Sequence, residues 1–177
     1  MTTENKRVAM VVHDYFEQVE MTEVRQLLEA EDIDVDLIAT EADEVHGLHH
    51  VELGDVFTVD KTIDEVTTSD YSAVVLPGGV VNGDQLRIVE SALDFIQAMY
   101  NDDKPIAAIC HAPWVLISAG LADGHTMTSY KTLRDDIQNA DGIWVDQEVV
   151  TDGNIITSRN PNDIPAFAHA IIDALND

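Results

Sequence analysis

The sequence predicts an α/β fold in which an open, mostly parallel sheet is covered by helices on both faces. Short apolar runs alternate along the chain with stretches of helical periodicity. The 177 residues, of which 45% are hydrophobic, are enough for one sizeable core. Because no linker or repeat interrupts this pattern, we expect residues 1–177 to form a single domain.

The first third of the chain predicts a strand, a helix and a second strand. Apolar runs at 7–12 and 35–39 have the length of buried strands, and helical spacing of apolar residues lies between them at 24–28. Residues 41–66 differ, because short alternating pieces predict an excursion that contains a small β-hairpin.

The middle third continues the alternation. A buried strand at 73–76 is closed by Pro77-Gly78-Gly79, and apolar spacing then predicts one helix from about 84 to 100. The next strand, at 106–109, runs almost directly into a helix that contains 114–117. We therefore expect very little loop between this strand and its helix.

The last third adds a short strand at 126–128 and a helix through 133–137. The segment 148–157 predicts a hairpin with an Asp152-Gly153 turn, and the final helix spans about 162–175.

Three loops should meet at one edge of the sheet. In open parallel sheets, sites lie beyond the carboxyl ends of the strands. This rule brings together residues 13–20, 77–84 and 110–114.

The charge of the chain excludes several classes of function. It has 34 acidic and 9 basic residues, with a net charge of −25, and a surface that neutralises nucleic-acid or lipid phosphates needs Lys and Arg. No apolar run is long enough to span a membrane, and we expect a cytoplasmic protein. The acidic residues recur throughout the chain, which favours adaptation to a high-salt cytoplasm over an acidic binding surface.

Cys110 is the strongest candidate for a reactive residue. It is the only cysteine, so it cannot form an internal disulfide. A strand that ends in Cys110 and leads directly into a helix has the layout of a nucleophile elbow. The helix N-terminus should lower the pKa of the thiol. The alternative is a cysteine buried as a small hydrophobic residue.

Neighbouring loops supply possible partners for Cys110. The backbone N–H groups of Gly78 and Gly79, with that of His111, could hold an oxyanion, although Pro-Gly-Gly also makes a plain turn. Glu17 and Glu20 suit the first turn of a helix in any case. A desolvated carboxyl at the sheet edge would keep its proton and could hydrogen-bond a thiolate, and Glu20 is our candidate.

Other motifs carry less information. His46, His49 and His50 form a local cluster, for which a surface role is favoured over metal binding. We predict no metal site. Because the chain has no Gly-x-Gly-x-x-Gly and no Walker loop, no nucleotide or other cofactor is expected.

The sequence resembles the PfpI branch of the DJ-one/PfpI superfamily over nearly its whole length. The matching segments are Phe16-Glu17-Gln18-Val19-Glu20, Leu76-Pro77-Gly78-Gly79-Val80 with Asn82 and Asp84-Gln85-Leu86-Arg87, Lys104 through Trp114, Thr128-Ser129-Tyr130, Asp135-Asp136, Asn139-Ala140, Trp144-Val145-Asp146, Glu148-Val149-Val150, and Thr157-Ser158-Arg159 with Pro161, Asp163 and Pro165. The resemblance implies a flavodoxin-like three-layer sandwich with small hairpin excursions.

The resemblance also implies roles for individual residues. Cys110 would be the nucleophile, Glu20 the carboxyl that contacts its sulfur, and His111 the histidine of a catalytic dyad. An acidic residue from a neighbouring subunit completes the site in members described as proteases, and Asp84 matches it best. A homo-oligomer, dimer or hexamer, is therefore expected. Trp114 and Tyr130, in matching segments, are assigned with Glu17, Gly78 and Gly79 to substrate binding. Ala112 departs from the family's usual Gly, and its methyl group is expected to narrow the pocket.

Three functions follow from the resemblance. The first is a glutathione-independent glyoxalase or protein deglycase, in which Cys110 acts on small reactive carbonyls or their adducts. The second is an oligomeric intracellular cysteine peptidase that acts on peptides. The third is a redox-sensing stress protein whose Cys110 oxidises to sulfinate. We place the carbonyl-directed function first, because one compact domain offers no evident peptide cleft.

Overall fold

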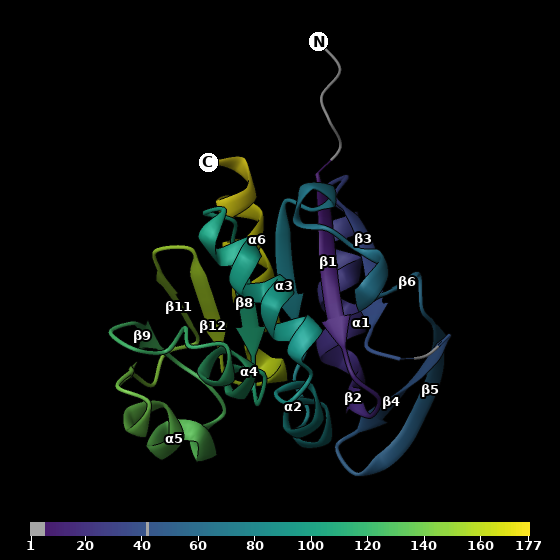
Figure 1. The fold of residues 1–177 in the computed structure, drawn as a ribbon. Coiled ribbons are helices and arrows are strands. Elements are labelled where there is room, and N and C mark those ends of the chain that lie inside the picture. Colours follow the sequence, from purple (N-terminus) through teal and green to yellow (C-terminus); the bar gives the residue numbers. More distant parts are fainter. Residues whose placement is uncertain (1–5, 42) are drawn as a thin grey trace.

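The chain folds around a seven-stranded sheet with helices on both faces (Figure 1). The computed structural model describes residues 6–41 and 43–177. The strand order is β11-β12-β8-β7-β1-β3-β6, and every neighbouring pair is parallel except β11 and β12. The strands of this sheet are β1 (Arg7–Val12), β3 (Asp34–Ala39), β6 (Lys61–Thr62), β7 (Ala73–Leu76), β8 (Ile106–Ile109), β11 (Val149–Asp152) and β12 (Ile155–Ser158).

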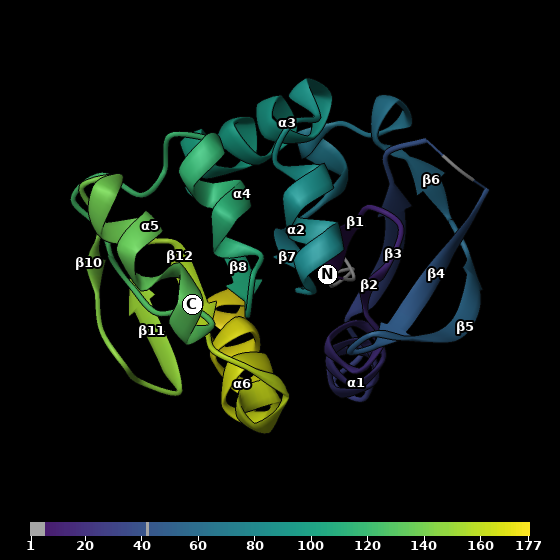
Figure 2. The same ribbon diagram turned by 90° about the horizontal axis from the view of Figure 1, so that it is seen from below.

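Two helical layers cover the sheet. Helices α1 (Gln18–Glu29) and α6 (Ile164–Asn176) lie on one face, and α3 (Glu90–Asn101) and α4 (Pro113–Ser118) lie on the other (Figure 2). Strand β1 shows why two layers are needed, since Ala9 and Val11 pack into one core while Val8, Met10 and Val12 pack into the other. Side chains alternate between the faces of a strand, so a continuous apolar run must be buried on both. The predicted α/β sandwich is confirmed.

Smaller sheets make the predicted excursions. Strands β4 (Glu44–His49) and β5 (Glu52–Thr58) form an antiparallel hairpin, and β2 (Phe16–Glu17) pairs with β4. Strands β9 (Thr126–Met127) and β10 (Ile143–Trp144) form a separate parallel pair. The hairpins expected at 41–66 and 148–157 are both confirmed.

The single helix predicted from 84 to 100 is wrong. The structure has α2 (Val80–Leu86) and then α3, and Val89 between them is extended, with φ −88° and ψ 102°. Helix α2 packs against α4 and β2 at the strand ends, whereas α3 packs on β7 and β8 of the sheet. The apolar spacing runs from Leu86 through Val89 into α3, and it therefore conceals the break. The remaining helix, α5 (Arg134–Asn139), follows a 3₁₀ turn.

Within residues 6–41 and 43–177, none of the helices combines the length and the apolar character needed to cross a membrane.

Candidate active site

Cys110 occupies a sharp turn between β8 and α4. Its φ is +64°, a left-handed conformation that is unusual for a residue with a side chain. Two bonds hold it there: the Cys110 N–H donates to the Ser158 carbonyl (3.1 Å), and the Cys110 carbonyl accepts from the Tyr130 N–H (2.8 Å). This is the elbow that the strand-to-helix spacing predicts. It points the thiol, in a residue that is 7% exposed, towards the carboxyl ends of the strands.

The Pro-Gly-Gly loop lies against the elbow so closely that Gly78 has no room for a side chain. A Cβ atom at Gly78 would come within 2.3 Å of Glu20 Oε2 and 2.6 Å of Cys110 Cβ. Gly79 has φ +99°, a conformation that glycine adopts without strain. The Gly79 N–H reaches the Cys110 thiol. The loop is therefore more than a plain turn.

A buried amide fixes the position of this loop. Asn82 is fully buried, and its Nδ2 donates to the Pro77 carbonyl (2.8 Å) and to the Gly78 carbonyl (3.2 Å). Its Oδ1 accepts from the His13 N–H (2.7 Å). Asn82 thereby joins the loop after β7 to the loop after β1.

Glu20 lies beside the thiol without exposure to solvent. The Gly78 N–H donates to its Oε2 (2.8 Å), and its buried Oε1 has no nitrogen or oxygen partner among the described residues. Burial, together with the negative charge of Glu17, raises the pKa of Glu20 to about 8. Glu20 therefore carries its proton at neutral pH, as the sequence predicts for a desolvated carboxyl at this edge.

The surroundings of the Cys110 thiol act on its pKa in opposite directions. Burial and an ionised Glu20 raise the pKa, whereas the backbone N–H groups of Gly79 and His111 lower it. The raising contributions are larger, contrary to the lowering expected from the helix N-terminus. The reason is that helix α4, which should lower the pKa, has only six residues, whereas the Glu20 carboxyl and the apolar core lie next to the sulfur. Because the two acids interact, they titrate as a pair, and the first proton leaves near the raised pKa of Glu20.

His111 reaches the sulfur although it directly follows Cys110. Its Nδ1 lies 3.1 Å from Cys110 Sγ, and its Nε2 lies 3.5 Å from Thr132 Oγ1. The ring stacks on Tyr130, with 4.7 Å between centroids, and meets Trp114 edge to face at 5.3 Å. Burial lowers the pKa of His111 to about 4, so the ring is neutral at pH 7 and can accept a proton.

A pocket of about 420 Å³ opens over the thiol. It brings together six of the residues predicted for the site: Glu17, Glu20, Gly79, Cys110, His111 and Tyr130. Its remaining walls are His50, Val51, Val80, Thr132 and Pro161. A volume of this size suits a small molecule or one side chain.

Sequence reasoning missed the contributions of the hairpin and of Thr132. His50 and Val51 form the turn between β4 and β5, which folds back to the pocket mouth. His50 is exposed, as expected for the histidine cluster, and it also borders the pocket. No local sequence signal identifies Thr132. Asn82, by contrast, lies in one of the segments that match the family, and that match points to it.

Three predicted residues do not border the pocket. The Gly78 N–H is directed at Glu20 Oε2, so its assignment to an oxyanion hole is replaced by a role in holding that carboxyl. Trp114 supports His111 from behind, and its Nε1 donates to Asp136 (2.8 Å), so its assignment to direct substrate binding is replaced by a supporting role. Asp84 lies exposed on α2, where its carboxylate accepts from Gln85 Nε2 (3.0 Å). Its predicted contribution to a neighbouring subunit's site stays a prediction.

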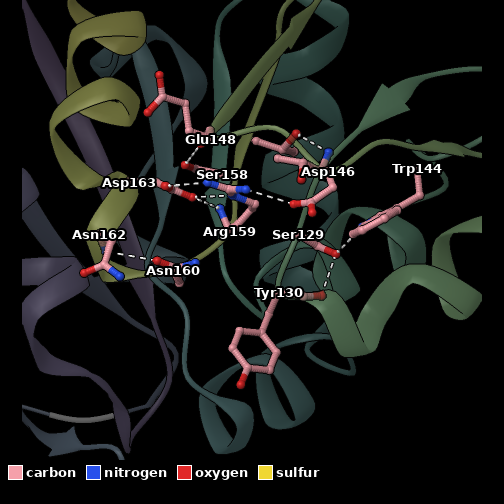
Figure 3. Close-up of polar contacts among 12 residues, drawn as sticks. Ser129, Tyr130, Trp144, Asp146, Glu148, Ser158, Arg159, Asn160, Asn162 and Asp163 are labelled. Carbon is pink, nitrogen blue, oxygen red and sulfur yellow. Dashed lines mark hydrogen bonds and ion pairs between the residues drawn. The ribbon is translucent and has the colours of Figure 1, made fainter.

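An ion-pair network supports the elbow on the side of β12 (Figure 3). Arg159 donates Nε and Nη2 to the buried carboxylate of Asp163 (2.8 and 3.0 Å) and Nη1 to Asp146 (2.8 Å). It directly follows Ser158, whose carbonyl accepts the Cys110 N–H. The Tyr130 ring points away from this network.

In the part of the chain that the structure describes, no three His, Cys, Asp or Glu side chains are grouped to hold a metal ion.

Comparison with known proteins agrees with this geometry. The model of the DJ-1/PfpI family matches residues 6–174. The chain belongs to this family. Its relatives include "Deglycase PfpI" of Pyrococcus furiosus, 39% identical over 160 residues that cover 90% of this chain and 93% of the relative.

Other relatives of this DJ-1/PfpI chain carry different names. "Putative cysteine protease YraA" of Bacillus subtilis is 38% identical over 172 residues, which cover 97% of this chain and 99% of the relative. A two-domain crystal structure from Anabaena variabilis, with DJ-1/ThiJ/PfpI-like and ferritin-like domains, superposes with a TM-score of 0.90 at 30% identity. That match covers 97% of this chain and 50% of the Anabaena protein. Names within the family thus suggest enzymatic activity and leave the reaction open.

Proposed function

We propose that the protein is a cysteine-dependent enzyme that acts on small reactive carbonyls, as a glutathione-independent glyoxalase or protein deglycase. The observation that carries the proposal is the Cys110 thiol at a strained elbow within a pocket of about 420 Å³. A protonated carboxyl and two backbone N–H groups surround the sulfur. The relative named deglycase supports the same class of substrate.

The first step forms a bond between sulfur and carbon. Neutral His111, whose Nδ1 lies 3.1 Å from Sγ, takes the Cys110 proton as the sulfur attacks the aldehyde carbon of a dicarbonyl, and the carbonyl π electrons move onto oxygen. The N–H groups of Gly79 and His111 stabilise this oxyanion, and Glu20 supplies the proton that neutralises it. The proton held by His111 then passes to the Glu20 carboxylate, so that the imidazole is neutral again. If the substrate is an aminocarbinol, its carbon–nitrogen bond breaks as the sulfur–carbon bond forms, and the amine leaves with a proton.

The following steps need no external oxidant or reductant. Neutral His111 removes the proton from the former aldehyde carbon, and the electrons form an enediol. Protonation of the adjacent carbon then gives a thioester. Water hydrolyses the thioester, which releases a 2-hydroxy acid and regenerates the thiol.

Conversion of methylglyoxal to lactate without glutathione tests this proposal. We expect wild-type protein to form lactate and Cys110→Ser to lose the activity while it melts at the wild-type temperature. Glu31→Gln, an exposed acid remote from the pocket, serves as the control and should retain activity. Lactate formation that survives Cys110→Ser would refute the proposal.

Peptidase activity is the second candidate, and the 3.1 Å contact between Cys110 Sγ and His111 Nδ1 favours it. Such a pair is the arrangement of a nucleophile and its base. In this case Asp84 would complete the site of a neighbouring subunit in a homo-oligomer. Casein cleavage should then co-elute with a high-order oligomer and fall in Asp84→Asn. The control Asp94→Asn changes an exposed acid on α3 and should leave cleavage unchanged. Cleavage by a monomer would contradict this candidate.

A redox sensor is the third candidate, because the N–H groups near the sulfur would also stabilise a sulfinate. A peroxide-dependent mass gain of two oxygens at Cys110, with no turnover of methylglyoxal or casein, would favour it. Turnover of either substrate would reject it as the sole function.

A further inference from the structure

The pocket over Cys110 has a fixed negative charge near its mouth. Glu17 is 8% exposed and borders the pocket together with Glu20. Its charge is felt inside the site, because it contributes to the raised pKa of Glu20. Since Glu20 keeps its own proton at neutral pH, Glu17 supplies the carboxylate that an incoming ligand meets.

The hairpin turn holds the Glu17 carboxylate in place. The His50 backbone N–H donates to Glu17 Oε2 (3.1 Å), and His50 Nδ1 lies 3.8 Å from the same oxygen. His50 has φ +61°, a conformation in which glycine would be less strained. The turn therefore orients a backbone donor towards Glu17, while the imidazole itself remains largely in solvent, with 84% of its side chain exposed.

Glu17 has no cationic neighbour in the pocket, because the described lining contains no lysine or arginine. Arg159 lines a neighbouring pocket that shares Tyr130, and its guanidinium is already paired with Asp146 and Asp163 (Figure 3). The mouth of the pocket is thus anionic on one side, and the exposed side chains of Val51 and Val80 make other parts of it apolar.

We propose that Glu17 is a specificity-determining residue that admits neutral or amine-bearing carbonyl compounds and excludes anionic ones. A carboxylate held in a partly desolvated mouth repels an anion and attracts an ammonium group or a hydroxyl donor. The inference rests on the proposed carbonyl-directed function. Within it, the substrate class is a neutral dicarbonyl or the adduct of a dicarbonyl with an amine, and 2-oxo acids are disfavoured.

Alkylation of Cys110 tests this charge selection without any need for turnover. Iodoacetamide and iodoacetate have nearly the same shape and attack the same sulfur, but only iodoacetate is anionic. The ratio of their rates cancels differences in thiolate content and in nucleophilicity. Measurement in about 1 M salt, where the Debye length falls to about 3 Å, suppresses the field of the whole −25 chain and leaves the local effect of Glu17.

We expect the iodoacetamide-to-iodoacetate ratio in wild type to exceed that of a free cysteine peptide by roughly tenfold, for one carboxylate near the reagent. Glu17→Gln retains an oxygen that can accept the His50 N–H, and it should bring the ratio to within about threefold of the free thiol. Glu31→Gln should keep the wild-type ratio. A wild-type ratio equal to that of the peptide, or an unchanged ratio in Glu17→Gln, would overturn the proposal.

A second probe keeps the test decisive if Glu17→Gln does not fold. In wild-type protein, 2-aminoethyl methanethiosulfonate should modify Cys110 faster than its 2-sulfonatoethyl counterpart, relative to the free peptide, and the reverse order would refute the charge selection. The alkylation experiments and the lactate assay test the role of Glu17 and the proposed function separately. Charge selection without lactate formation would refute the glyoxalase reaction alone, and lactate formation without charge selection would refute only the role of Glu17.

Discussion

Replacement of Glu20 by glutamine should change how the stability of the protein depends on pH. Gln has the shape of a protonated Glu and can still accept the Gly78 N–H, but it cannot ionise. In the folded protein the pKa of Glu20 is raised from 4.5 to about 8, mainly because the carboxyl is buried. Below pH 4.5 the carboxyl is protonated in both folded and unfolded chains, so its ionisation costs nothing. As the pH rises, the unfolded chain ionises first, and the folded state of wild type is progressively disfavoured.

The magnitude follows from the interval between the two pKa values. At about 1.36 kcal/mol for each pH unit, wild type should lose roughly 5 kcal/mol relative to Glu20→Gln between pH 4.5 and 8. The loss should level off above pH 8. Because the protein has 34 acidic residues, the absolute stability of each variant also changes with pH. The difference between wild type and variant removes those common contributions.

Urea unfolding, monitored by tryptophan fluorescence at pH values from 5 to 9, measures this difference. The experiment is done in about 1 M salt, where surface charges are screened. Glu31→Gln is the matched control, since an exposed acid should give a difference from wild type that is nearly independent of pH. The offset between wild type and Glu20→Gln at pH 5 reports how well Gln fits the site and does not bear on the argument. A constant difference across the pH range would refute the reasoning that burial keeps the Glu20 proton in place.

Three further predictions concern the elbow and the surface. Gly78→Ala places a methyl group within 2.3 Å of Glu20 Oε2 and 2.6 Å of Cys110 Cβ. We therefore expect urea unfolding to show a loss of about 1–3 kcal/mol in unfolding free energy, and the lactate assay to show a loss of lactate formation. Wild-type values in both assays would contradict this prediction. The rate of Cys110 alkylation by iodoacetamide should rise with a midpoint above that of a free cysteine peptide, because burial and the neighbouring Glu20 raise the pKa of the thiol. A midpoint at or below that of the peptide would instead support control by the helix N-terminus. The melting temperature should rise from dilute buffer to molar salt, because salt screens repulsion in a chain of charge −25, and a flat response would reject adaptation to salt.

Much of the fold is determined locally, and the sequence was therefore sufficient to predict it. The apolar runs that became β1, β7 and β8 are short and continuous, and only a sheet buried on both faces accommodates them. The break between α2 and α3 could not be found in this way. Apolar spacing reports which side of a segment is buried, and that side stays the same across the break at Val89.

The reactive residue was predictable for the same local reason. A strand that runs into a helix within a few residues must turn sharply, and Cys110 at that turn has φ +64°. The meeting of Glu20 with the thiol was predicted from the rule that the carboxyl ends of parallel strands share one edge. Glu20 is the candidate on that ground alone, and the resemblance to the family implies the same role for it.

Only the tertiary structure decided the electrostatics of the site and the shape of its mouth. The direction of the Cys110 pKa depends on how deeply the sulfur is buried and on the carboxyl beside it, and neither quantity is encoded in the helix that follows. The Glu17–His50 contact joins residues 33 positions apart through a hairpin turn, a distance at which residue spacing carries no information. The sequence by itself thus determined that Cys110 sits on a sharp strand-to-helix elbow of an α/β sheet, and long-range packing decided which charges surround it.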